Sequence, residues 1–370
     1  MTCERPVPVL GSDYEMLRST LRGLADDLAE VDPAAPLDPS VLKQLAARDL
    51  LSDDGADPPD VEWLAWLVLF EELGPSPVGA GLLARVALGA VMTHLLGGGS
   101  AGAAELRDAA LSGETGLALA IQEPGPRWAR GEHATRAAGG SAPRLSGTKR
   151  AVAQASTADV LVVVAADDVG THLYAVDRGA QGLTVVEAPT IDASLAVSAV
   201  HLDGAPARRL SEVDLADGPL VRALSFARLA IAAMCVGSAW RALGLAVDYL
   251  QDRRQFGTTL REFQAVSHRC GRSRIRLEQM RALATRAALE GAHGDWPALP
   301  HSAAMARMFC GDGYASVTAE AMRAEGAIGI TWENALALHY RRAHWLRELL
   351  GGRALERRLL LEEAIRLVPG

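Results

Sequence analysis

Apolar residues recur at helical spacing through the first third of the chain. Between Asp13 and about Ala110 they return every three or four positions, as in Leu17, Leu21, Leu24 and Leu28 and again in Leu64, Leu67, Phe70 and Leu73. This period is typical of amphipathic helices with one buried stripe. Prolines and a glycine run interrupt it at Pro58–Pro59, Pro75, Pro77 and Gly97–Gly99. The pattern predicts an all-helical first region with turns at these interruptions.

The pattern changes between Gly116 and about Leu210. Short runs rich in valine, leucine and threonine are separated by Gly, Asp and Pro, and the clearest are Leu117–Ile121, Val160–Ala165, His172–Val176 and Leu183–Val186. Such runs are typical of strands. Because no segment of helix length lies between successive runs, we expect a compact antiparallel β domain, a barrel or a sandwich.

Helical periodicity returns after Asp214 in four long segments, Leu220–Gln251, Glu262–Gly291, Ala298–Gly326 and Ala335–Leu367. Long helices joined by short loops predict an antiparallel four-helix bundle. The expected fold class is therefore mostly α with a central β domain. Its three parts are an N-terminal helical domain (1–113), a middle β domain (114–214) and a C-terminal helical bundle (215–370).

Composition and charge exclude several classes of protein. The 370 residues are 49% hydrophobic and 22% charged, as in a folded globular chain, and the net charge of −8 offers no basic footprint for nucleic acid. The most apolar stretch, Leu229–Trp240, is shorter than the roughly 20 residues of a membrane-spanning helix. Met1–Leu10 lacks the apolar core of a signal peptide. We expect a cytoplasmic protein that binds neither nucleic acid nor membrane.

Metal-binding residues do not cluster in the sequence. The four cysteines lie far apart, and His268, His339 and His344 have no acid at ligand spacing. We therefore expect reduced thiols, structural histidines and no metal site.

The segment Arg253–Val266 carries the most informative chemistry, and it begins Arg-Arg-Gln-Phe-Gly and ends Phe-Gln-Ala-Val. A guanidinium can hold a pyrophosphate through two hydrogen bonds, and an aromatic ring can cover adenine. By itself the pattern also fits a helix-turn-helix corner with solvated arginines. The segment resembles the "R-x-Q-F-G … F-Q-x-V" signature of acyl-CoA dehydrogenases, which reaches the FAD of a neighbouring subunit. The resemblance implies cofactor contacts from Arg253, Gln255, Phe256 and Gln264.

Three further segments resemble the same family in order and spacing. Leu117–Gly125 ends in Glu-Pro-Gly, like the strand that borders the flavin, which implies contacts from Ile121 and Gln122. Gly147–Val160 resembles the hairpin that follows, "G-x-K … A-D". Glu325–Glu333 resembles "G-G-x-G-F-T-x-E", a turn that meets the dinucleotide of the partner subunit, here through Gly326 and Gly329. The resemblance spans essentially the whole chain and implies this family's fold, bound FAD and an oligomer.

The chain departs from the family in the flavin loop. Where the family has "E-P-G-x-G-S-D", Glu-Pro-Gly is followed here by Pro126–Arg130, which reads Pro-Arg-Trp-Ala-Arg. Ala151 and Ala153 stand where the family often has tryptophan and threonine, and Arg323 stands where it has glutamine. These differences predict weaker flavin binding or a different occupant.

A second departure concerns the catalytic base. Removing the α-proton of a thioester while hydride leaves the β-carbon requires a base on the face opposite the flavin. The positions that hold this carboxylate in family members correspond to Leu350, Ala227 and Met234. None of these side chains accepts a proton. An alignment shifted by one turn would assign the role to Glu333 or Glu348, although an acid after a glycine turn is also typical of a helix cap.

Arg228 lies in an otherwise apolar helix. The family has an arginine there, near the thioester end of the ligand pocket, so the resemblance implies substrate binding. The alternative interpretation is an arginine that extends from a buried helix to solvent.

Three functions are compatible with these residues. The first is an FAD-dependent oxidoreductase that carries out α,β-dehydrogenation of an acyl thioester on coenzyme A or an acyl-carrier protein. It would act as a homo-oligomer or as the base-lacking subunit of an unequal complex with a related dehydrogenase. The second is a redox-neutral or non-catalytic relative, namely a cyclase, dehydratase, isomerase or scaffold subunit. The third is a flavin-dependent monooxygenase, which needs no carboxylate because reduced flavin activates oxygen.

Overall fold

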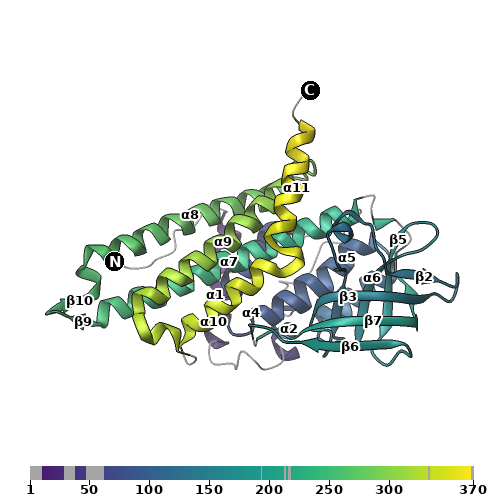
Figure 1. The fold of residues 1–370 in the computed structure, drawn as a ribbon, viewed down its shortest axis with the longest axis horizontal. Helices are drawn as coiled ribbons and strands as arrows, with labels where there is room; N and C mark the ends of the chain where they lie inside the picture. The colour runs from purple at the N-terminus through teal and green to yellow at the C-terminus, as the bar shows by residue number, and fades with distance from the viewer. Residues whose placement is uncertain are drawn as a thin grey trace. The chain divides into compact units, whose positions relative to one another are not determined.

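The computed structural model describes residues 11–28, 38–46, 62–192, 194–211, 214–215, 218–331 and 334–367 (Figure 1). Its contacts divide the chain into two units. The helical unit contains residues 1–31, 63–79 and 228–370, and the β unit contains residues 32–62 and 80–227. The expected fold class, mostly α with a central sheet, is confirmed. The boundaries of the three predicted domains follow changes of element type rather than contacts, so they stay a prediction.

The helical unit is built from long helices around α7 (Pro219–Asp252), which enters it at Arg228. The side chains of residues 223–240 in α7 are all buried, on every face of the helix. This burial is typical of a helix in the interior of a protein. α8 (Gln264–Ala292) packs on α9 (Leu299–Glu325), and α9 also contacts α10 (Ala335–Glu348) and α11 (Gly352–Leu367). α1 (Ser12–Asp27) packs on α3 (Trp63–Leu73), which also contacts α8.

The last helical segment is broken, contrary to the continuous helix expected over 335–367. A short 3₁₀ turn at Leu349–Gly351 separates α10 from α11, and α11 projects away from α10 in Figure 1. Leu350 has φ 54° and ψ 42°, while Gly351 and Gly352 have φ of 88° and 63°. A right-handed helix cannot continue through left-handed residues. The two glycines are therefore the physical reason for the break.

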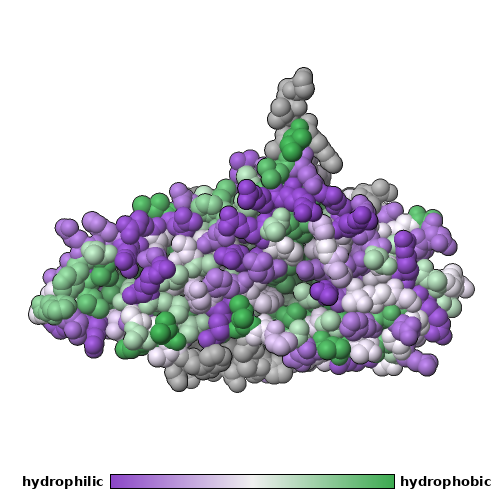
Figure 2. Space-filling model, in the orientation of Figure 1, coloured by the Kyte–Doolittle hydropathy of each residue, from purple (hydrophilic) through white to green (hydrophobic). Residues whose placement is uncertain are grey.

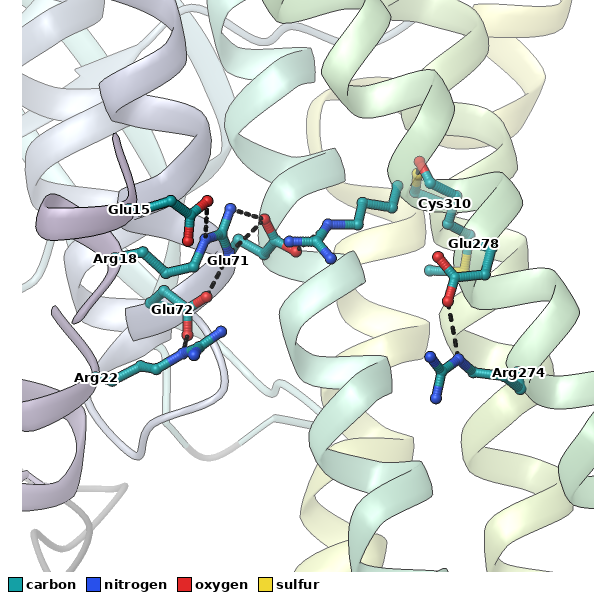
Figure 3. Close-up of polar contacts among 10 residues, drawn as sticks. Glu15, Arg18, Arg22, Glu71, Glu72, Arg274, Glu278 and Cys310 are labelled. Carbon is teal, nitrogen blue, oxygen red and sulfur yellow. Dashed lines mark hydrogen bonds and ion pairs between the residues drawn. The ribbon is translucent and has the colours of Figure 1, made fainter. Parts of the chain in front are cut away.

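A buried ion-pair network holds α1 on α3. Arg18 Nη1 donates to Glu71 Oε2 at 3.1 Å and to Glu72 Oε1 at 2.5 Å. Arg22 Nε donates to Glu72 Oε2 at 3.1 Å, and Arg281 Nε of α8 lies 3.0 Å from Glu71 Oε1. Figure 3 shows Arg18 reaching both carboxylates. Three helices that are distant in sequence are thus joined through two buried glutamates.

The first part of the β unit is helical. Its elements are α2 (Pro39–Ala46), α4 (Gly79–Leu82), a π-helix η1 (Leu83–Val91), α5 (Met92–Gly97) and α6 (Ala101–Leu111). Gly98 ends α5 in the left-handed conformation, and the Ser100 side chain caps α6 by accepting from the amide of Ala103. The turn predicted at Gly97–Gly99 is confirmed. Pro58–Pro59 lie outside the described residues.

The eight strands of the β unit form one sheet in the order β6-β7-β3-β2-β4-β5-β8, with β1 also paired to β4. They are β1 (Leu117–Ala120), β2 (Arg136–Ala138), β3 (Arg144–Ala153), β4 (Val160–Ala166), β5 (Thr171–Asp177), β6 (Leu183–Ala188), β7 (Val197–Pro206) and β8 (Arg208–Arg209). The four runs predicted as strands are therefore confirmed. Their buried side chains form one core, which includes Leu145, Leu161, Tyr174 and Val200.

The expectation of a purely antiparallel sheet was wrong at one strand. β4 runs parallel to β1, with Leu117 opposite Val160, and parallel to β2, with Arg136 opposite Ala166. Parallel neighbours need a crossover connection rather than a tight hairpin. Residues 121–159 supply it, since they contain the 3₁₀ turn η2 (Arg127–Arg130) and the β2–β3 hairpin.

Two helical stretches are long and apolar enough to cross a membrane by composition alone. They are Gly79–Gly97 and Pro219–Asp252, and 94% and 89% of their most apolar windows are buried within the protein. This burial is typical of core helices. Among the described residues, no three His, Cys, Asp or Glu side chains are grouped so that they could hold a metal ion.

Candidate functional site

The Arg253–Gln264 segment forms a protruding hairpin at the α7–α8 connection (Figure 1). Strands β9 (Arg254–Gln255) and β10 (Thr258–Thr259) pair antiparallel around Phe256 and Gly257, whose φ angles are 53° and 85°. Two successive positive φ values are typical of a type I′ turn, which matches the twist of a two-residue hairpin. The segment is therefore a short β-hairpin rather than a simple helix-turn-helix corner.

The side chains predicted to contact a cofactor are exposed on this hairpin. Phe256 is 93% exposed, and its ring meets Phe263 edge to face at 6.3 Å between centroids. Arg253 and Gln255 are exposed beside it, and Gln264 is exposed at the start of α8. Figure 2 shows apolar surface at this end of the helical unit. An aromatic ring left this bare on a stable turn is typical of a binding surface.

The second predicted turn also stands at the surface of the helical unit. α9 ends at Gly326, which has φ 72°, and the chain continues as a 3₁₀ turn η5 (Gly326–Ile330) with Gly329 buried. The side chains of Ile328 and Ile330 are exposed. Asn334 then caps α10 and donates to Glu325 at 2.6 Å, which fixes the return of the chain.

The end of β1 places the two residues predicted to border a flavin. Ile121 is buried, while Gln122 is half-buried and its carbonyl accepts from the amide of Arg150 at 2.8 Å. The side-chain oxygen Oε1 of Gln122 is buried and has no hydrogen-bond partner among the described residues. A buried acceptor without a partner is costly, so a bound donor would stabilise this side chain.

Glu123, the next residue, anchors a buried polar cluster. Its carboxylate accepts from the amides of Ala134 at 2.6 Å and Thr135 at 3.0 Å, from the Thr135 hydroxyl at 2.7 Å and from Lys149 Nζ at 2.6 Å. His133 Nδ1 lies 3.2 Å from Lys149 Nζ and 3.5 Å from Glu123 Oε1. The Glu-Pro-Gly motif and the Gly-x-Lys motif thus meet through their charged residues.

The electrostatics of this cluster follow from burial and pairing. Burial opposes the charge on Glu123, but the hydrogen bonds to its carboxylate and the positive charge of Lys149 outweigh this effect and lower the pKa of this carboxyl below its ordinary value. Burial lowers the pKa of Lys149 to about 8, although Glu123 opposes this shift. Burial, together with the positive charge of Lys149, also lowers the pKa of His133. The cluster at neutral pH is therefore a carboxylate, an ammonium and a neutral imidazole.

The altered flavin loop has its own structure. Pro126–Arg130 enters η2, and Trp128 from this turn is buried. On β3, Ala151 has φ 50° at an irregularity between Lys149 and Val152, and Ala153 is buried. Ala151 therefore departs locally from regular strand geometry, whereas the predicted effect of these positions on flavin binding stays a prediction.

The three positions expected for the base have no proton acceptor. Ala227 and Met234 are fully buried in α7, and Leu350 occupies the break between α10 and α11. Glu348 is exposed and lies 3.4 Å from Arg347 Nε on its own helix, as a surface ion pair does. Glu333 lies outside the described residues.

The structure reveals one buried carboxylate near the break that the sequence analysis missed. Glu356 of α11 accepts from Arg228 Nε through both oxygens at 3.0 Å, and Arg307 Nε lies 3.7 Å from Oε1. Arg307 also donates to the carbonyl of Leu349. Arg228 is therefore bound by a carboxylate of its own chain. Its predicted contact with a substrate stays a prediction.

The histidines considered as ligands have ordinary surroundings. His339 is buried and its Nδ1 lies 2.7 Å from the Tyr314 hydroxyl. Burial, with the positive charges of Arg342 and Arg241, lowers the pKa of His339 to about 3. His268 is exposed, and His344 packs edge to face on Tyr340 at 4.5 Å.

Comparison with known proteins identifies relatives of both units. Residues 220–365 match the family model for the acyl-CoA dehydrogenase C-terminal domain. Acyl-CoA dehydrogenase IpdE2 of Mycolicibacterium smegmatis is 39% identical over 127 residues, which cover 34% of this chain and 38% of that protein. The mitochondrial short-chain specific acyl-CoA dehydrogenase of Bos taurus is 26% identical over 358 residues, which cover 90% of this chain and 85% of that protein.

The fold also matches solved structures over its whole length. One is the ChsE4–ChsE5 complex from Mycobacterium tuberculosis, with a TM-score of 0.81, 21% identity and coverage of 100% of both chains. This likeness extends the match from the C-terminal helices to the β unit.

Proposed function

We propose that this chain, which belongs to the acyl-CoA dehydrogenase family, is the base-lacking subunit of a two-component flavoprotein that acts on an acyl thioester. One observation carries the proposal. The left-handed break at Leu350 is present, but the side chain there is apolar and cannot accept a proton. A catalytic base must therefore come from elsewhere.

The described residues fit FAD as the cofactor. An exposed guanidinium at Arg253 suits a pyrophosphate, and the bare ring of Phe256 suits an apolar ring system. The unpartnered Oε1 of Gln122 suits a donor on the flavin. When bound, FAD supplies the acceptor for the hydride that leaves the β-carbon of the substrate. The residues of this chain would hold and orient the cofactor, and those on the hairpin would do so across a subunit interface.

The partner would be a related dehydrogenase subunit that carries the missing carboxylate. The ChsE4–ChsE5 structure is a complex of two components, which supports such an arrangement here. The projecting hairpin and the exposed isoleucines of η5 would provide the contact surface on this chain.

The test is the visible spectrum of the protein purified alone and after co-expression with a related dehydrogenase subunit, before and after anaerobic addition of acyl thioesters. We expect bleaching of the flavin band only in the complex. Bleaching in the isolated chain would contradict the proposal, because it requires a base within this chain. A preparation without flavin in either form would also contradict it.

A gain-of-function variant sharpens the test. Leu350→Glu places a carboxylate at the break, and we expect it to give the flavin-loaded protein measurable bleaching by a thioester. Leu361→Glu is the matched control, because Leu361 is an exposed leucine on the adjacent helix. Equal behaviour of the two variants would mean that position 350 does not face the substrate.

A redox-neutral or scaffold role is the second candidate, and one observation favours it. Arg228, the arginine expected near the thioester, donates its Nε to Glu356, so part of its guanidinium is already bound within the chain. A purified complex that binds acyl thioester but carries no flavin on this chain would support the second candidate over the first.

A further inference from the structure

A cavity of about 550 Å³ is lined entirely by residues of the β unit. The lining residues come from the loop after β1, the start of β2, and the turn between β4 and β5. Its lining includes Trp128, His133, Arg136 and Asp167. Its volume is in the range of small-molecule sites, which is roughly 300–1,000 Å³.

His133 is one of the lining residues, and its imidazole is buried in the cavity wall with a donor. The ammonium of Lys149 has three protons and three neighbours, namely Glu123 Oε1 at 2.6 Å, His133 Nδ1 at 3.2 Å and the Ile121 carbonyl at 3.4 Å. An ammonium can only donate, so Nδ1 accepts. A neutral imidazole then carries its proton on Nε2.

The Nε2 donor of His133 is unsatisfied. The side chain is 0% exposed, and Nε2 has no hydrogen-bond partner among the described residues. Leaving a buried donor unpaired costs roughly 1–3 kcal/mol. An acceptor atom that reaches Nε2 from the cavity side would remove that cost.

Charge around the cavity favours an anionic acceptor. Each lining carboxylate already has a cation, because Glu123 pairs with Lys149, Glu132 lies 3.9 Å from Arg127, and Asp167 lies 3.6 Å from Arg209. Asp167 also accepts from the amides of Val169 and Gly170 and from the Tyr174 hydroxyl. Arg136, which is exposed on β2, has no carboxylate partner within the described part of the chain.

We propose that this cavity is a binding site for a small molecule that carries an oxyanion, a phosphate or a carboxylate. The oxyanion accepts a hydrogen bond from His133 Nε2 and pairs with the Arg136 guanidinium, while Trp128 forms an apolar wall. Guanidinium and imidazole N–H groups are both suited to such oxygens. The site uses residues of the altered loop, and none of the residues proposed above to hold FAD is among its lining residues.

The test is a calorimetric titration of the purified protein with ADP, inorganic phosphate and succinate. We expect at least one of them to bind, and the one that binds identifies the anionic group. His133→Phe and Arg136→Gln should each weaken binding by about tenfold or more. Arg144→Gln is the matched control, because Arg144 is an exposed arginine of the same sheet that donates to the Gly204 carbonyl. It should bind like the parent protein.

Two results would overturn the proposal, and neither depends on flavin. The first is no binding of any probe at millimolar concentration. The second is binding that both substitutions leave unchanged. Should His133→Phe fail to fold, Arg136→Gln still decides the question. Nitrogen NMR of the His133 ring in the unaltered protein adds a direct readout, because the Nε2 proton signal should shift on titration.

Discussion

Replacing Arg18 by methionine tests the ion-pair network between α1 and α3. The Arg18 side chain is 1% exposed and loses its contacts with both Glu71 and Glu72 in this variant. Removing one partner of a buried ion pair costs about 3–5 kcal/mol, because a charge is left uncompensated. Here Glu71 retains Arg281 at 3.0 Å and Glu72 retains Arg22 at 3.1 Å. We therefore expect the lower end of that range, about 3 kcal/mol of unfolding free energy.

Urea unfolding at neutral pH, followed by circular dichroism, measures this loss. The matched control is Arg22→Met, whose side chain is 45% exposed in the parent protein and which should cost about 1 kcal/mol or less. A double-mutant cycle with Glu72→Gln should show a coupling of roughly 1–3 kcal/mol with Arg18. A loss below about 1 kcal/mol for Arg18→Met, equal to that of the control, would refute the reasoning.

Three further predictions concern acid stability, the helix break and the hairpin. The pKa of His339 is about 3 in the folded protein against 6.5 ordinarily, so between these values the unfolded chain binds more protons and stability falls as the pH drops. His339→Gln should remove up to about 1.4 kcal/mol per pH unit of that slope, and an unchanged slope in acid-dependent urea unfolding would contradict this. Gly352→Ala should destabilise by about 1 kcal/mol or more, because the φ is 63° and the new Cβ would lie 2.6 Å from Glu348 Oε2. Gly244→Ala in α7, where a Cβ meets nothing within 4 Å, should be neutral or stabilising in the same melting experiment. Arg253→Gln should lower the flavin content per chain without moving the unfolding midpoint, and loss of both together would indicate a structural role instead.

Much of the fold could be predicted because its signals are local. The apolar residues of α7 recur without a polar face, and the strand runs are short and bounded by turn residues, so both element types follow from neighbouring positions. The direction of a strand relative to its neighbours does not follow from neighbouring positions. The alternation of side chains is the same in parallel and antiparallel strands, so nothing within Leu117–Ala120 indicates that it lies parallel to β4. The break at Leu350 had a local signal in Gly351 and Gly352.

The candidate site was predictable where a motif lies in one segment and hidden where partners are distant. The hairpin residues around Phe256 are contiguous, so their proximity follows from the sequence. Glu356 lies among charged residues of a helix that shows almost no apolar stripe, and its partner Arg228 is 128 positions earlier. His133 resembles any polar loop residue until the fold buries it beside Lys149. These side chains are buried by contacts between segments that are distant in sequence, so their roles could not be predicted from the residues around them.

The pairing of Arg228 and Arg307 with Glu356 has a consequence for synthesis on the ribosome. Both arginines are buried, in α7 and α9, which leave the ribosome before α11. Their shared counter-ion, Glu356, belongs to α11. α1, the earliest described helix, likewise pairs with Glu71 on α3, which is joined to α8 by Arg281. The helical unit therefore cannot complete its interior until translation has passed residue 356, whereas the whole sheet of the β unit has been made by then. A nascent chain stalled before residue 356 should accordingly be protected from proteases in its β unit and digested in its helical one.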